Sequence, residues 1–316
     1  MATSATTSDA SPAPSASGAE DVASPDGWPS DLASLRAELD GLDDAVHDLL
    51  MRRAEIVSFL ASSRFKTPGA ALRPGREASI IRRLLARHHG PLPPGSIVRI
   101  WRELLAATTG MQGAHVIAVC ETDSAGGYAQ VAREHFGALT AMRIHTSPAQ
   151  ALADVGAGNA SAAVLPMPSE IETPAAAWWT ALLYKDAPRI HVIARLPFWA
   201  PRTEGAPTLP AMVIAAFPPD ASGSDRSLLG LEMPLDVSRA RMTAALTGAG
   251  LAPSQIVLRR DPGPDAARAL VEVDGLLAED DPRLATLGLV LRRPIVLGAY
   301  AVPVGGGSQT ANGDRR

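Results

Sequence analysis

Apolar side chains recur at steps of three and four residues across 31–64, which is the pattern of one amphipathic helix. Two shorter helical patterns follow at about 76–88 and 96–112. Ser30 is the expected N-cap of the first helix, and Pro74 suits the first turn of the second. At 1.5 Å per residue the first helix is about 50 Å long. One small domain cannot cover such a helix, so we expect two chains to intertwine as a dimer.

The pattern changes after this helical part. Short β-rich runs alternate with helical segments across 113–200 and predict a small parallel βαβαβ unit. A helix is predicted around Trp178 and Trp179, with both tryptophans as packing anchors. The Pro-rich segment 201–210 is predicted as a linker.

The last third predicts a second β-containing part. Strands and helices follow the order βαββαβ across 211–304, which is the ferredoxin-like plan, with its second helix over 281–290. The segments 1–29 and 305–316 are predicted as disordered tails. The sequence therefore predicts a multidomain α plus α/β protein with a helical domain at 30–112.

Composition excludes several classes of protein. The single cysteine, Cys120, rules out a disulfide framework and fits a reducing cytoplasm, where we expect the protein to act. No apolar run is long enough to span a membrane, and the first residues lack the basic and apolar regions of a secretory signal. The segment 31–112 holds twelve bases and nine acids, an excess too small and too interleaved with acids to predict nucleic-acid binding.

Polar side chains occupy positions where the helical patterns predict apolar ones. Arg53 continues the stripe of the first helix, Glu77 begins that of the second, and Thr108 and Gln112 prolong that of the third. Charges in such positions are costly unless they are paired. One explanation is structural, with an ion pair between Arg53 and Glu77 and a hydrated end of the third helix.

The other explanation is a binding site for an anion. Arg36, Arg64 and Arg76 add three guanidinium groups to the same helices, so arginines outnumber the one carboxylate in the stripe. Arginine binds carboxylates through two parallel hydrogen bonds, and each charge-assisted bond contributes about 1.5 to 3 kcal/mol. The pattern therefore predicts a small, dianionic ligand.

Three stretches resemble the all-helical chorismate mutase family: LRAELDGLDDAVHDLLMRRAEI, RPGREASIIRRL and IVRIWRELLAATTGMQ. The resemblance covers about residues 31–112. It implies that Arg36 reaches the partner subunit's site, that Arg53 and Arg76 bind substrate, and that Thr108 lies near a carboxylate. It implies catalytic roles for Glu77, which accepts the substrate hydroxyl, and for Gln112 beside the ether oxygen. Arg64 stands where the family usually has a lysine that donates to that oxygen.

The resemblance also implies a reaction and its requirements. Chorismate would rearrange to prephenate in a pericyclic step that needs no nucleophile, metal or cofactor. Catalysis then consists of holding the substrate in a compact conformation and directing donors at the oxygen that gains negative charge. A millionfold acceleration corresponds to about 8 kcal/mol.

The later regions resemble the partners to which such mutases are fused. The segment 113–200 is similar to the first half of a prephenate dehydratase, but the Thr-Arg-Phe signature of that enzyme is missing, so we expect no dehydratase activity. The segment 211–304 is similar to an ACT domain, and an amino-acid effector there stays an open question. Two alternatives to a mutase without dehydratase activity remain. One is a bifunctional mutase and dehydratase, and the other is a non-catalytic dimer that binds a metabolite.

Overall fold

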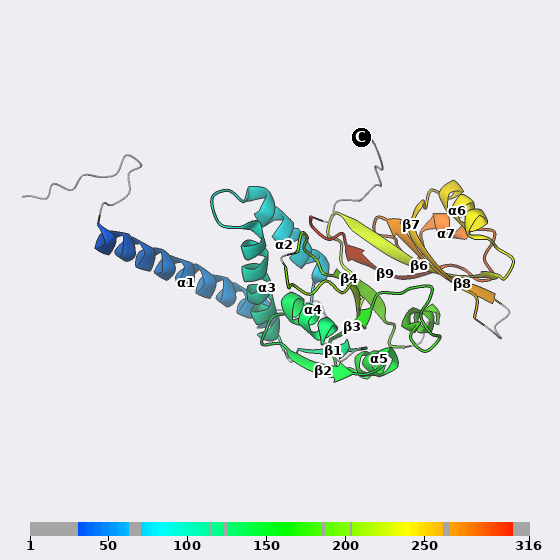
Figure 1. Cartoon of the computed structure of the whole chain (residues 1–316), viewed down its shortest axis with the longest axis horizontal. Coiled ribbons are helices and arrows are strands. Elements are labelled where there is room, and N and C mark those ends of the chain that lie inside the picture. The colour runs from blue at the N-terminus through cyan, green and yellow to red at the C-terminus, as the bar shows by residue number, and fades with distance from the viewer. Residues whose placement is uncertain are drawn as a thin grey trace, which may run out of the picture. The chain divides into compact units, whose positions relative to one another are not determined.

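The structure is a computed structural model that describes residues 31–62, 71–113, 115–122, 126–184, 187–202, 204–261 and 266–305 (Figure 1). The predicted tails, except for Gly305, lie outside the described residues, as do Ser30 and Arg64. The chain divides into two compact units, Met1–Phe59 and Leu60–Arg316.

The first unit is dominated by the long helix that the periodicity predicts, α1 (Leu32–Ser62). Asp31 begins it, because its carboxylate accepts a hydrogen bond from the Ser34 backbone N–H at 2.9 Å and thereby satisfies a free donor of the first turn. No residue of α1 is buried. None of the helices in the described part of the chain is long and apolar enough to cross a membrane.

Two helices open the second unit, α2 (Pro74–Arg87) and α3 (Pro94–Gly110). Each has a proline in its first turn, where the missing N–H costs no hydrogen bond. Their buried faces do not form a closed helical core. They pack in one cluster with Phe198, which follows His191–Leu196, and with Ala301 of the last strand; its helical members are Ala78, Ile81, Val98 and Leu105.

The predicted βαβαβ unit follows. Strand β1 pairs in parallel with β2 and β3 on its two sides. Ile117 and Val119 of β1 pack with α4, whereas Ala118 and Cys120 pack in the cluster that contains α5, so the two helices cover opposite faces of the sheet. These elements are β1 (Val116–Cys120), α4 (Gly127–Phe136), β2 (Ala141–His145), α5 (Pro148–Gly156) and β3 (Ala162–Pro166).

Two predictions for the next segment are corrected. The tandem tryptophans lie on a short 3-10 helix, η1 (Trp178–Leu183), and both are buried as predicted. Strand β5 (Ala211–Ala215), which begins where we expected the ACT-like part, pairs instead with β3 and with β4 (His191–Leu196). Both partners are antiparallel to β5, so the chain reverses across the predicted linker.

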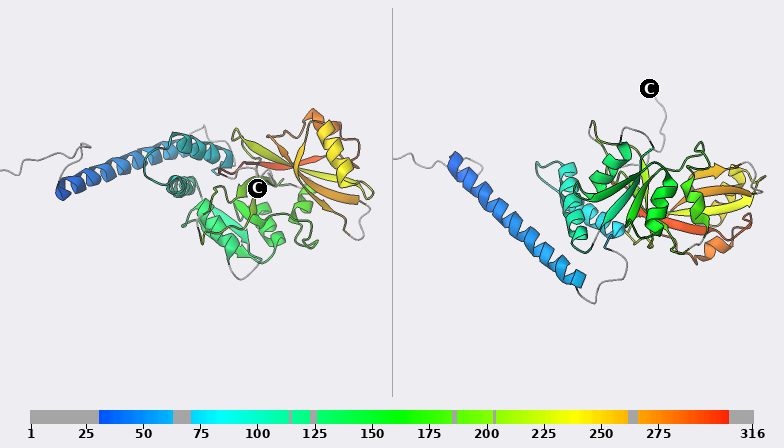
Figure 2. Two further views of the ribbon diagram at one scale, coloured as in Figure 1. Left: turned by 45° about the horizontal axis from the view of Figure 1, so that its top comes forward. Right: turned by 90° about the horizontal axis from the view of Figure 1, so that it is seen from below.

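The last elements follow the predicted order βαββαβ. The strands pair antiparallel in the order β9-β6-β8-β7, and α6 lies along them (Figure 2). Helix α7 is shorter than predicted: four residues are helical, where 281–290 were expected. The elements are β6 (Asp225–Pro234), α6 (Arg239–Gly248), β7 (Pro253–Arg259), β8 (Ala266–Asp274), α7 (Pro282–Ala285) and β9 (Ile295–Ala301).

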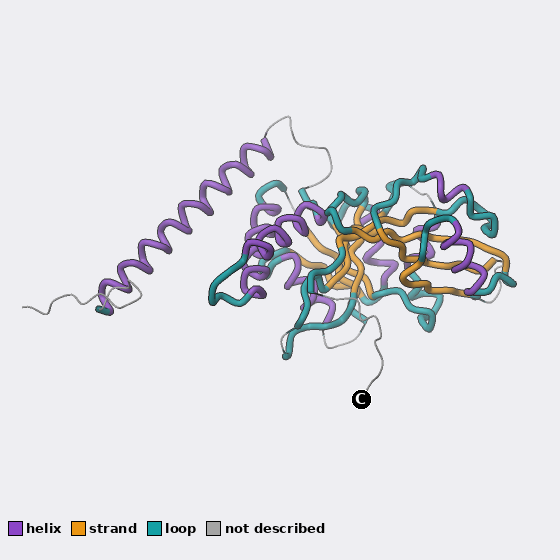
Figure 3. Tube along the Cα trace, turned by 90° about the horizontal axis from the view of Figure 1, so that it is seen from above, coloured by secondary structure: helices purple, strands orange, loops and turns teal. Residues whose placement is uncertain are grey.

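All nine described strands belong to one mixed sheet, which runs through both predicted β-containing parts (Figure 3). The two halves join where Val192 of β4 pairs in parallel with Gly298 of β9. Gly298 has φ +138°, and a Cβ there would lie 2.1 Å from the Val192 carbonyl oxygen. Only glycine permits this close approach of the two strands.

A buried carboxylate ties the strands together beside this joint. Glu272 of β8 is 3% exposed and accepts hydrogen bonds from Ser254 Oγ and Arg226 Nη1, each at 2.7 Å. Tyr300 of β9 donates its hydroxyl to the same carboxylate, and Arg195 Nη1 of β4 lies 3.6 Å away. Burial raises the pKa of Glu272, but these hydrogen bonds and charges outweigh burial and leave the pKa below its usual value.

We predict that Glu272→Gln lowers the free energy of unfolding by about 2 to 4 kcal/mol, less than for a fully enclosed pair because both arginines are partly exposed. Asp274→Asn is the matched control: its carboxylate also pairs with Arg226 but is 82% exposed, so we expect a change below about 0.5 kcal/mol. Urea denaturation measures both. Because the folded pKa of Glu272 is lowered, the stabilisation is present above the usual carboxyl pKa and declines as the pH falls through the folded value. Equal effects of the two substitutions would contradict this role.

Candidate functional site

Six of the seven residues expected at the site lie in the described structure, divided between its two units. Arg36 and Arg53 belong to α1 in the first unit, and Arg53 is the less exposed of the two. The other four described residues belong to the second unit: Arg76 and Glu77 on α2, and Thr108 and Gln112 beside the end of α3. The seventh residue, Arg64, lies outside the described residues.

Glu77 is buried and forms an ion pair. Its Oε2 accepts a hydrogen bond from Nη1 of Arg102 on α3 at 2.9 Å, and the two side chains are 11% and 5% exposed. Burial raises the pKa of Glu77 and lowers that of Arg102, while the charge of each partner acts in the opposite direction. An isolated buried charge would be very unfavourable, so each residue requires the other.

Arg102 also connects the helices to the β-containing part of the unit. Its guanidinium lies 4.8 Å from the centre of the Phe198 ring, within cation–π range. His135 of α4 is buried nearby, and burial together with the charge of Arg102 holds its pKa well below the usual value. Glu134, whose charge also acts on Arg102, is paired with Arg202. These residues form a charged cluster between α3, α4 and the segment after β4.

Arg76 points differently from its neighbour. Its side chain is exposed, whereas its backbone N–H donates to Asp220 Oδ2 at 3.0 Å. The Gly75 N–H donates to the other oxygen of the same carboxylate at 2.8 Å. Asp220 therefore caps α2 from more than 140 residues away, and a Cβ at Gly75 would lie 2.1 Å from the Asp220 carbonyl oxygen. An external anion has no access to these two donors.

Thr108 and Gln112 lie one turn apart. The buried Thr108 hydroxyl donates to the carbonyl oxygen of Leu104 at 2.9 Å, and Gln112 Nε2 donates to the Thr108 carbonyl oxygen at 3.3 Å. Thr108 shares the buried side of α3 with Arg102. The structure thus brings Glu77 together with Arg102, and Thr108 together with Gln112.

Sequence reasoning missed Arg102 and Asp220. Arg102 follows Val98 by four residues and precedes Leu105 by three, so it occupies the same buried stripe in α3. A charge within an apolar stripe was the signal that revealed Glu77, and the same signal is present at Arg102. Asp220 left no local signal, because its partners at α2 are distant in the chain.

The hollows near these residues differ in size. The cavity beside Arg102, His135 and Phe198 has a volume of about 20 Å³, which is enough for a water molecule but not for an organic substrate. A larger hollow of about 410 Å³ lies between α3, Gly137 and the start of β2, and is lined by small residues together with Glu103, His115 and Leu139. Another, of about 260 Å³, is lined by Leu84, Ile97 and Trp101 with Arg87, His88 and His89.

In the segment that resembles a prephenate dehydratase, a carboxylate occupies backbone N–H groups that could otherwise bind an anion. Glu121, directly after β1, accepts hydrogen bonds from the backbone N–H groups of Tyr128 and Ala129 at 3.4 and 3.0 Å. Free N–H groups at the start of a helix are suited to bind anions. Here the chain's own carboxylate occupies these two donors of α4.

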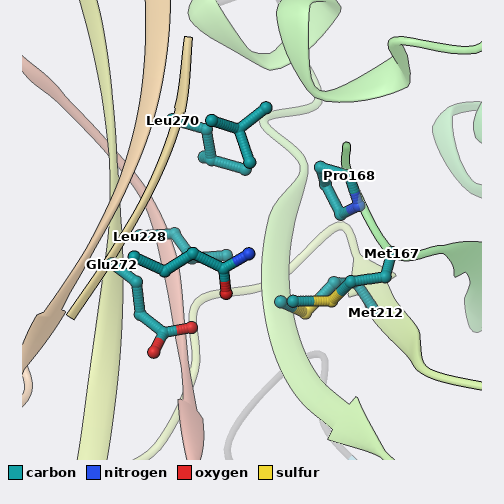
Figure 4. Close-up of a pocket in the computed structure, with 8 residues that line it drawn as sticks. Met167, Pro168, Met212, Leu228, Leu270 and Glu272 are labelled. Atoms are coloured by element: carbon teal, nitrogen blue, oxygen red, sulfur yellow. The ribbon is translucent and has the colours of Figure 1, made fainter. Parts of the chain in front are cut away.

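A slot lies between this part and the last strands (Figure 4). Met167 and Pro168 face Leu270 across it, and the Glu272 carboxylate lies at one end (Figure 4). Its volume is about 10 Å³, enough for one water molecule at most. The slot is therefore too small to be a substrate pocket.

We predict that the Glu77–Arg102 pair stabilises the second unit as a pair. Glu77→Gln and Arg102→Met should each cost about 3 kcal/mol, since each leaves a buried charge without its partner. The double variant should cost less than the sum, with a coupling of about 1 to 3 kcal/mol in a double-mutant cycle of urea denaturation. Arg99→Met, exposed on the same helix, is the control with an expected change below about 0.5 kcal/mol. Strictly additive effects would mean that the two side chains do not interact.

Comparison with known proteins shows that the helical part is similar to a known enzyme family. Residues 35–113 match the family model described as chorismate mutase type II. The bifunctional chorismate mutase/prephenate dehydratase of Pseudomonas aeruginosa is 24% identical over 147 residues. This match spans 45% of the present chain and only 40% of that curated relative.

Solved structures resemble the chain more distantly. A protein described as GqqA, a novel type of quorum quenching acylase, has a TM-score of 0.46 at 16% identity, over 60% of this chain and 96% of that one. The prephenate dehydratase of Streptococcus mutans has a TM-score of 0.44 at 15% identity, over 60% and 98%. By sequence, residues 35–113 match the chorismate mutase type II family, and the chain resembles the chorismate mutase/prephenate dehydratase fusions.

Proposed function

We propose that this protein is a chorismate mutase that converts chorismate to prephenate. The observation that carries the proposal is the family match over 35–113, which spans α1, α2 and α3 and includes all seven candidate residues. Because the match to the bifunctional relative covers less than half of either chain, the activity of the whole protein is part of the proposal.

The proposed mechanism uses arginines to bind and fold the substrate. Arg36, Arg53 and Arg76 would hold the two carboxylates, and Thr108 would lie near one of them. Arg64 and Gln112 would donate to the ether oxygen as it gains negative charge, and Glu77 would accept the substrate hydroxyl. Such donors stabilise the transition state more than the ground state, which is what raises the rate.

A second copy of the chain is part of this proposal. Leu39, Leu42, Val46 and Leu49 repeat along α1, and each is more than half exposed. The described residues 31–62 hold seven acids and three bases, whereas 71–113 hold seven bases and two acids. The acidic, apolar helix of one copy thus complements the basic α2 and α3 of another, whose Leu84, Ile97 and Trp101 are only partly buried.

We expect no dehydratase activity, although the curated relative is named for one. Glu121 already occupies two backbone donors at the start of α4. The Thr-Arg-Phe signature is also missing from the sequence. Incubation with prephenate tests this expectation, and formation of phenylpyruvate would show that the bifunctional alternative is correct.

The mutase proposal predicts that Arg53→Ala lowers kcat/KM for chorismate by about 10- to 150-fold, which corresponds to the loss of one charge-assisted contact of about 1.5 to 3 kcal/mol. Arg52→Ala is the matched control: Arg52 is the preceding residue, is exposed, and pairs with Glu55 at 2.8 Å. Its activity should stay within about twofold of the parent. Chorismate absorbance measures both rates, and equal rates in the two variants would remove Arg53 from the site.

The proposed dimer predicts that Leu49→Glu dissociates the protein, because a charge replaces an apolar contact worth about 1.5 to 3 kcal/mol. Asp48→Ser is the control: it changes the neighbouring exposed position and should leave the dimer intact. Sedimentation velocity at micromolar concentration distinguishes the two forms. A parent protein that sediments as a monomer would contradict the proposed second copy.

A further inference from the structure

The face of α2 that carries Glu77 is covered by the segment after β4 and by the end of β9. Ala78 and Ile81 of α2, together with Val98 and Leu105 of α3, pack against Phe198 and Ala301. Glu77 itself is buried. The residue expected to accept a substrate hydroxyl is therefore enclosed within the second unit.

Polar contacts hold this cover at its edge. Arg82 of α2 donates from Nη1 to Ser222 Oγ at 2.9 Å and from Nη2 to the carbonyl oxygens of Ser224 and Val302 at 3.0 and 2.6 Å. Ser79 Oγ donates to the Ser222 carbonyl oxygen at 3.1 Å. These contacts attach one side of α2 to the segment that leads into β6 and to the end of β9.

The enclosed space is too small for a substrate. The cavity beside the Glu77 partner Arg102 holds about 20 Å³, whereas pockets for small organic ligands measure roughly 300 Å³ or more. Both oxygens of Asp220 are also engaged by the first turn of α2. A dianion can reach Glu77 only after the helices separate from Phe198.

The cluster that must open is small. It contains six buried residues, against nineteen in the largest buried cluster of the second unit. Segments with few buried apolar contacts open at the lowest free-energy cost. The α2–α3 pair is thus the part of this packing best placed to separate while the nine-stranded sheet stays intact.

We propose that the packing of α2 and α3 on Phe198 and Ala301 is an autoinhibitory contact, which withholds Glu77 from substrate until the helix pair separates from the C-terminal strands. This inference rests on the proposed mutase function. The rate of the mutase then depends on the fraction of molecules in which the contact is open. A partner or ligand that bound the C-terminal strands and weakened the contact would raise the rate.

A reversible crosslink tests the contact in the full-length chain. Ser79→Cys with Ser222→Cys places two thiols at residues whose side chain and backbone are already within hydrogen-bond distance. The oxidised form should lose chorismate mutase activity at least tenfold, and a reductant should restore it. The single variant Ser79→Cys, treated with the same oxidant, controls for oxidation of Cys120, and mass spectrometry confirms the crosslink.

A second variant examines the opposite change. Arg82→Gln removes the charged contacts to Ser222, Ser224 and Val302 and should raise mutase turnover about three- to tenfold, with faster hydrogen exchange in α2. Arg83→Gln is the control, because Arg83 is exposed on the same helix. Equal turnover of the double-cysteine variant before and after reduction would overturn the autoinhibitory contact but not the mutase proposal. A parent and a reduced form that both leave chorismate unchanged would overturn the mutase proposal, and this inference with it.

Discussion

The ion pair between Glu77 and Arg102 is the constraint on which the arrangement of the helical part depends. Both side chains are nearly inaccessible to water, so neither helix can turn its face without leaving a buried charge unpaired. Arg102 extends the constraint to Phe198, and Asp220 holds the first turn of α2. Through these contacts α2 and α3 are packed on the β-containing part.

A second buried carboxylate has the same function within the sheet. Glu272 interacts with side chains from four strands through hydrogen bonds and charge. It lies beside the joint between β4 and β9, where only glycine fits. Hydrophobic packing alone would allow the two halves of the sheet to shift. The carboxylate, because it is buried, fixes their register through partners that must meet at one point.

The sequence predicted what depends on local pattern. Apolar periodicity located α1, α2 and α3 within a few residues, and alternating strands and helices located the βαβαβ and βαββαβ orders. It did not predict that β5 joins β3 and β4, since strand partners are chosen by contacts far apart in the chain. Helix α7 is only four residues long, although Leu287, Leu289 and Val290 beyond its end still pack in the same core, so the apolar pattern located buried residues but not the end of the helix.

The candidate site was predictable in composition but not in geometry. Glu77 was found because a charge interrupts an apolar stripe, and the same rule would have found Arg102. Which arginine pairs with Glu77 could not be read from periodicity, because Arg53 and Arg102 satisfy it equally well. The cover formed by Phe198 depends on packing between segments about 120 residues apart, which leaves no local pattern.

The central proposal is that arginines on these helices bind chorismate, a dianion, and that the site catalyses its rearrangement to prephenate. The most direct test follows chorismate and prephenate together, by chromatography, during incubation with the purified full-length protein. The account predicts that prephenate appears in the amount in which chorismate disappears, faster than without protein. Chorismate recovered unchanged at the uncatalysed rate would contradict it.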